Sequence, residues 1–126
     1  MFNFSGTRPT NLGVKSGNLA DCPSSPNCVN SQSTNPQSQI DPLPLVSISD
    51  LKKVIETMER TTIIEATDSY LYAEFKSKLM GYVDDVEFYL DPAANVIQVR
   101  SASRLGQSDL GANRQRIETI RQKLTR

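Results

Sequence analysis

The stretch best equipped to do chemistry is an arginine-rich segment that runs from Arg100 to Arg116. It carries four arginines, two glycines and one acidic residue, Asp109, around the expected start of a helix. A helix start offers free backbone N–H groups, glycine allows a ligand to approach closely, and arginine supplies charge and paired donors. The segment therefore predicts a site for a carboxylate or phosphate, or for an acidic partner. The candidate ligand-binding residues are Arg100, Arg104, Ser108, Asp109, Asn113 and Arg114.

Local helix chemistry explains some of the same residues without a ligand. Ser108 is a good N-cap, and Asp109 suits the positive end of the helix dipole, where it could fill the anion site itself. Asn113 falls on the apolar stripe of the helix, and a buried amide must find hydrogen-bond partners. We expect those partners to be backbone groups of the N-terminal arm or the strand end, which makes Asn113 a structural clamp rather than a catalyst.

A second motif contains the only two cysteines, Cys22 and Cys28, separated by a loop with two prolines. The short, restricted loop predicts that the sulfurs lie close enough to bridge. Such a disulfide would add about 2 kcal/mol in an oxidising compartment, whereas both thiols should be reduced in the cytosol. The spacing is not Cys-x-x-Cys and no helix start is expected beside either cysteine, which disfavours redox catalysis.

Composition argues against several classes of function. The 126 residues include no histidine, the commonest general base near neutral pH and the commonest metal ligand, and two sulfurs fall short of a structural zinc site. Lysine plus arginine equals aspartate plus glutamate at fourteen each, so non-specific binding to nucleic acid is disfavoured. No apolar run could span a membrane and no signal peptide is visible, so a cytoplasmic location is expected, with neither metal nor cofactor.

The periodicity of the chain predicts an α+β fold, with one domain overall. Residues 1–46 form an extended, irregular arm rich in proline, serine and asparagine, with the two-cysteine loop inside it, and residues 47–126 form the α+β domain. An amphipathic helix capped by Ser47 runs to about Glu59. A four-stranded antiparallel meander follows, and a C-terminal helix starts near Ser108 with Leu110 on its apolar stripe. The expected strands cover residues 61–66, 70–76, 82–90 and 96–104.

Alternation along the strands divides the sheet into two faces. The apolar face, which should take both helices, contains Ile64, Leu71, Ala73, Phe75, Val86, Phe88, Ile97 and Val99. The polar face contains Glu65, Tyr70, Tyr72, Glu74, Asp85, Glu87, Tyr89, Gln98, Arg100 and Arg104. The register must set Arg100 opposite Asp85 or Glu87. That pair is either a solvated surface pair contributing less than about 1 kcal/mol or an arginine held ready for a ligand.

Three segments together resemble a known family. They are FSGTRPTNLGV from Phe4, CPSSPNCVNSQ from Cys22 and RSASRLGQSDLGANRQRIE from Arg100. In this order they resemble the family catalogued as domain of unknown function 1499, and their spelling is similar to that of members from photosynthetic lineages. The resemblance covers nearly the whole chain, and it implies no established reaction, substrate or cofactor.

Three functions fit these observations. The first is a non-enzymatic binding or accessory domain whose arginine-rich junction meets a small anion or an acidic partner. The second is an enzyme that uses Asp84, Asp85, Glu87 and Asp109 as acid–base groups and arginines as electrophilic clamps. The third is a structural role in which the arm and its cysteines mediate association. Clustering of Arg100, Arg104, Asp109 and Asn113 in a concave pocket would favour the first two, and a flat surface with every arginine paired would favour the third. We expect the charges of Arg100, Arg104 and Arg114 to converge near the helix start.

Overall fold

The helix that opens the α+β region begins where the capping pattern predicts. The computed structural model describes residues 4–106 and 109–125, and in it α1 spans Ile48–Glu56. The Ser47 hydroxyl accepts a hydrogen bond from the backbone N–H of Asp50 at 3.0 Å. The helix ends earlier than expected, with Thr57 as its C-cap, and Arg60 then adopts a left-handed φ of 55° as the chain turns into the first long strand.

Four strands follow one another as the predicted antiparallel meander. They are β2 (Thr61–Ala66), β3 (Tyr70–Lys76), β4 (Val83–Asp91) and β5 (Val96–Ser103). A fifth strand, β1 (Cys28–Asn30), comes from the arm and pairs with β5, so the order across the sheet is β1-β5-β4-β3-β2. The prediction of four strands is therefore wrong by one. Three residues are too few to show alternation, and their partner lies far away in the chain.

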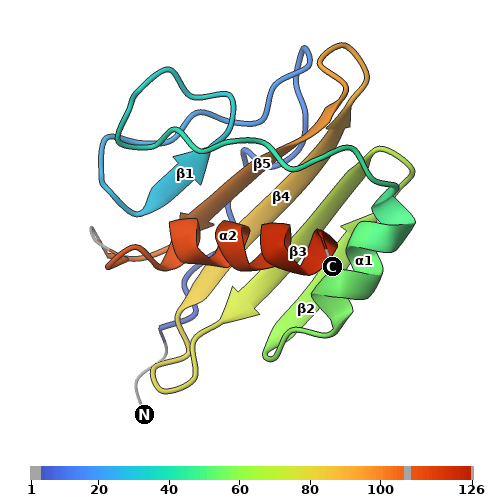
Figure 1. Cartoon of the computed structure of the whole chain (residues 1–126). Helices are drawn as coiled ribbons and strands as arrows, with labels where there is room; N and C mark the ends of the chain where they lie inside the picture. The colour runs from blue at the N-terminus through green and yellow to red at the C-terminus, as the bar shows by residue number, and fades with distance from the viewer. Residues whose placement is uncertain (1–3, 107–108, 126) are drawn as a thin grey trace.

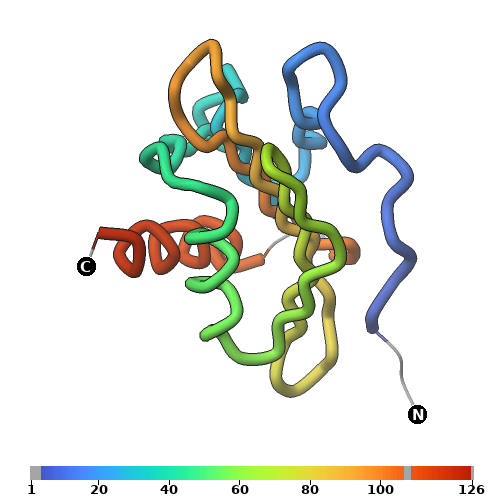
Figure 2. The backbone as a smooth tube through the Cα atoms, turned by 90° about the vertical axis from the view of Figure 1, so that its right-hand side faces the viewer, coloured from blue at the N-terminus to red at the C-terminus, as the bar shows by residue number. Residues whose placement is uncertain are grey.

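Different segments cover the two faces of the sheet, and Figure 2 shows the sheet nearly edge-on. Both helices, α1 and α2 (Ala112–Leu124), pack on one face (Figure 1), and the N-terminal segment runs along the other. We call this segment, residues 4–21, the strap. The helix side holds the hydrophobic core, to which the later part of the arm adds Ile40 and Leu43. None of the helices in the described ranges is both long and apolar enough to cross a membrane.

One residue assigned to the core face lies on the opposite face. The pairing of β2 with β3 shifts between Ile63 and Glu65, so Ile63 pairs with Ala73 and Glu65 pairs with Tyr72. This β-bulge places the intervening Ile64 outside the core, with 39% of its surface exposed. Alternation alone predicted the wrong face because a bulge inserts one residue without leaving a clear mark in the sequence.

Candidate functional site

The last helix starts later than its sequence pattern predicts. α2 begins at Ala112, with Gly111 as its N-cap at a φ of 82°. Leu110 also has a positive φ, 53°, and is 96% exposed, so it does not belong to the buried stripe. Two consecutive left-handed residues break any continuous helical path. Ser108 lies outside the described residues, and its capping role stays a prediction.

Asp109 occupies the position that an external anion would take at this helix start. Its carboxylate accepts hydrogen bonds from the backbone N–H of Gly111 at 2.8 Å and of Asn113 at 3.1 Å, and from the Asn113 side-chain amide at 2.7 Å. Burial by itself would raise the pKa of Asp109, but these bonds together lower that pKa below its ordinary value. The helix start is therefore satisfied from within the chain.

We expect Asp109→Asn to lower the free energy of unfolding by about 1 kcal/mol at pH 7, the usual effect of losing a cap. Because the folded-state pKa lies below the ordinary 3.8, the carboxylate stabilises the fold at neutral pH, and this stabilisation is lost as the pH falls below about 4. The difference from the parent should shrink between pH 7 and pH 3, measured by urea unfolding. Asp68→Asn, in an exposed turn, is the control. A difference that does not depend on pH would contradict the capping role.

Asn113 is fully buried and joins the helix to the sheet and the arm. Its amide group donates to the Asn27 carbonyl at 3.1 Å and to the Ser103 hydroxyl at 2.9 Å, so arm and strand end both supply the predicted partners. Its oxygen accepts from the Ser101 hydroxyl at 2.6 Å and from Arg116 Nη1 at 2.7 Å. Asn113 thus works as a clamp between three segments.

Arg116 is a site residue that the candidate set omits. Its Nη2 pairs with Asp84 Oδ2 at 2.7 Å, and its guanidinium carbon lies 4.9 Å from the centre of the Phe75 ring. The signal for it was present, since Arg116 follows Asn113 by three residues and therefore shares its side of the helix. The sequence did not indicate that Asp84 is the acidic partner of Arg116.

The cysteine loop also contacts the junction between β5 and α2. Cys22 and Cys28 form a disulfide with their Cα atoms 5.7 Å apart, which confirms the predicted proximity. Asn27, next to Cys28, accepts from the backbone N–H of Ser103 at 3.0 Å and donates from its side chain to the Gly106 carbonyl at 2.7 Å. The disulfide therefore fastens the arm onto the junction between β5 and α2.

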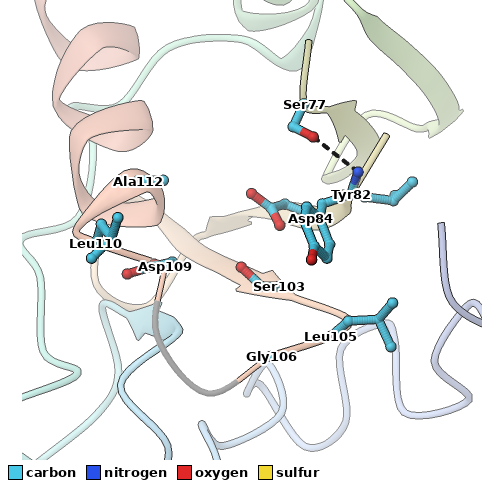
Figure 3. A pocket seen from close by; sticks show the side chains of 10 residues that line it. Ser77, Tyr82, Asp84, Ser103, Leu105, Gly106, Asp109, Leu110 and Ala112 are labelled. Atoms are coloured by element: carbon cyan, nitrogen blue, oxygen red, sulfur yellow. Dashed lines mark hydrogen bonds between the residues drawn. The ribbon is translucent and has the colours of Figure 1, made fainter. Parts of the chain in front are cut away.

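A pocket of about 310 Å³ opens between the β3–β4 loop and the junction of β5 with α2 (Figure 3). We call it the junction pocket. Its lining residues include Tyr82, Asp84, Ser103, Leu105, Leu110 and Ala112. Among the described residues, seven large apolar side chains are exposed, and five of them lie in these two connections: Leu79, Met80, Tyr82, Leu105 and Leu110. A concentration of this kind marks an interaction site.

The arginines do not converge as expected. Arg100 and Arg104 project from the face of β5 beneath the strap, where they bond to strap carbonyls. Arg114 lies on α2, which packs against the other face, and its Nη2 donates to the Gln37 carbonyl at 3.2 Å. Strand alternation and helix packing thus send the three charges to opposite sides of the sheet.

A charged cluster lies under the strap, where the sequence predicted a solvated face. Arg104 pairs through Nε with Asp85 Oδ2 at 2.8 Å and through Nη2 with Glu74 Oε2 at 2.6 Å, and only 7% of its side chain is exposed. Glu74 also accepts from Arg8 of the strap. The interpretation of this face as exposed surface pairs is wrong, because strap residues with no regular pattern cover it.

Arg100 stands opposite Glu87 in the register, as predicted, yet the two do not share a hydrogen bond. Arg100 donates instead to the carbonyls of Ala20 at 2.8 Å and Asp21 at 3.3 Å. Glu87 Oε2 accepts from the backbone N–H of Gly13 at 2.6 Å and from the Tyr70 hydroxyl, while the buried Oε1 has no hydrogen-bond partner in the part of the chain that the structure describes. Burial raises the pKa of Glu87 and lowers the pKa of Arg100, since both charges are removed from water.

The fold and these contacts define a small α+β domain whose sheet is covered by two helices on one face and by a strap on the other, with a pocket at one end. The chain belongs to the family described as protein of unknown function (DUF1499), whose model matches residues 18–124. No curated protein and no solved structure matches the chain.

Proposed function

We propose that the protein is a non-enzymatic binding domain that takes a small, mainly apolar molecule into the junction pocket. The observation that carries the proposal is the gathering of exposed apolar side chains, Tyr82, Leu105 and Leu110 among them, around a cavity of ordinary ligand size. Exposed apolar surface is costly in water, and covering it favours binding.

The polar groups of the pocket select the ligand's chemistry. Asp84 uses Oδ2 for Arg116, and within the described parts of the chain its Oδ1 accepts no hydrogen bond. Ser103 contributes a hydroxyl whose oxygen already accepts from Asn113. Arg116 balances the charge of Asp84. The pocket therefore suits an apolar molecule with one hydrogen-bond donor, and its described lining contains no arginine that would favour an anion.

The test compares benzyl alcohol, benzylammonium and benzoate, which share a ring and differ in the polar group. We expect the alcohol and the ammonium to shift the amide NMR signals of Gly106 and Ala112 with millimolar dissociation constants, since the ligands are small. Leu105→Ala should weaken binding at least about threefold, because it removes most of a buried contact. Leu45→Ala is the control, since Leu45 is similarly exposed (45% against 40%) and does not line the pocket.

Preference for benzoate would contradict this proposal and support the anion-binding junction. Failure of all three ligands to bind would contradict the pocket as a ligand site. The carboxylate enzyme has less support, because Asp85 and Glu87 are buried and Asp109 caps a helix. A structural role that uses the cysteines for association has less support, because they are joined to each other.

We further propose that the protein works in an oxidising compartment. Disulfides persist in such compartments and are rare in the cytosol. The bridge between Cys22 and Cys28 supports this location over a cytoplasmic one.

A further inference from the structure

We propose a second ligand site, independent of the junction pocket, on the strap side of the sheet. A groove of about 580 Å³ lies there between the strap and strands β2 to β4. We call it the tyrosine groove. Its principal lining residues are Leu12, Val14, Ile64, Tyr70, Tyr72 and Tyr89. The structure assigns it to a neutral, flat aromatic ring, bound by stacking.

The floor of the groove is a rigid aromatic platform. Tyr70 pairs with Tyr89 across β3 and β4, and Tyr72 is two residues along on the same face. The hydroxyl groups of Tyr70 and Tyr72 donate to Glu87 and Asp85, which lie on β4 on the same face of the sheet. Burial and these bonds raise the pKa of both phenols, so they stay protonated and keep donating.

The hydroxyls of Tyr70 and Tyr72 are thus occupied, and Tyr72 is itself buried under Arg8, so the ring surface left for a ligand belongs to the half-buried Tyr70 and Tyr89. An extended peptide would need donors for its carbonyl groups, as aromatic grooves that bind proline-rich segments provide. Here the hydroxyls of Tyr70 and Tyr72 are already used by buried carboxylates. A flat ring needs only apolar surface and ring faces, and offset or edge-on contact between rings is favourable.

The walls of the tyrosine groove are apolar, and the backbone explains why these apolar side chains lie there. The β-bulge in β2 sets Ile64 beside the face that carries Tyr72, which explains why an isoleucine is found there. Leu12 and Val14 form the opposite wall, and Gly13 between them is anchored to Glu87 at 2.6 Å. Gly13 has a φ of 98°, which favours glycine at this position.

The two charged residues that line the groove, Arg8 and Glu65, have opposite signs, which favours a neutral ligand. The guanidinium carbon of Arg8 lies 5.8 Å from the centre of the Tyr72 ring, and the group pairs with Glu74. Glu65, opposite Tyr72 in the register, contributes a negative charge to the lining. A strongly charged ring would meet repulsion from one of these groups.

The test titrates phenol against cyclohexanol, which share a six-membered ring and a hydroxyl and differ in aromaticity. We expect phenol to shift the amide NMR signals of Gly13 and Ile64 and to bind about three- to tenfold more tightly than cyclohexanol. Tyr89→Leu should remove that preference. Tyr82→Leu, which alters the junction pocket, should leave binding at the groove unchanged.

Equal binding of phenol and cyclohexanol would overturn the stacking site, as would phenol shifts confined to Gly106 and Ala112. Tighter binding of a decaproline peptide at Gly13 and Ile64 would also overturn it, in favour of a polypeptide ligand. If Tyr89→Leu does not fold, Ile64→Ser replaces it, because Ile64 lies outside the core and its loss should weaken phenol binding by a similar factor.

Discussion

Arg104→Ala is expected to lower the free energy of unfolding by about 3–5 kcal/mol, because it leaves Asp85 buried without its cationic partner. Asp85 is 1% exposed, and its remaining hydrogen-bond partner among the described residues is the Tyr72 hydroxyl. The hydrogen bond to Asp85 raises the pKa of Arg104, because the carboxylate stabilises the charged guanidinium. The measurement is urea unfolding at pH 7 with linear extrapolation to water.

Arg114→Ala is the matched control for Arg104→Ala. Arg114 is exposed and donates to one backbone carbonyl, so its loss should change stability by less than about 1 kcal/mol. Hydrogen exchange adds a local readout: in Arg104→Ala the Gly13 amide, which donates to Glu87, should exchange faster as the strap loosens. If both variants lose the same small amount, the charged cluster does not hold the strap.

The double substitution Cys22→Ser with Cys28→Ser is expected to lower the free energy of unfolding by about 2 kcal/mol, the loop-entropy value for so short a loop. It should also release Asn27, which accepts the hydrogen bond of the Ser103 backbone N–H. We expect exchange of the Ser103 amide to become about tenfold faster or more, while the amides of Val86 and Phe88 in the middle of the sheet follow only the global change.

Reduction of the parent protein with dithiothreitol should reproduce this pattern, because it breaks the same bond without changing the sequence. A loss of stability with no selective change at Ser103 would show that the disulfide stabilises the fold without positioning Asn27. No change in stability would show that the contacts of the arm suffice without the disulfide.

The local elements could be predicted because their signals lie within short windows. Ser47 and the apolar residues after it define α1, and alternation of apolar and polar residues defines β3, β4 and β5. Alternation placed Arg100 opposite either Asp85 or Glu87, and the register of the structure pairs it with Glu87. The strand β1 and the bulge at Ile64 could not be predicted, because one is a pairing with a distant segment and the other shifts the register by a single residue.

The candidate site was predicted in part. Asp109 and Asn113 satisfy helix and strand groups as the local chemistry suggests, and Arg116 could have been added from its spacing. The burial of Arg104 could not be predicted, because it depends on where an irregular strap lies. The separation of Arg104 from Arg114 could have been predicted, because the sequence already placed Arg104 on the polar face and both helices on the apolar face.

The sequence by itself determined the order of the elements from α1 onward, the division of the sheet into an apolar and a polar face, and the closeness of Cys22 and Cys28, because each depends on neighbours within a few residues. Only the tertiary structure decided that the strap buries the polar face, that the arm meets the helix start through Asn27, and where the pockets open. These outcomes come from contacts between segments far apart in the chain. A local pattern of residue types does not indicate the free energy of such contacts.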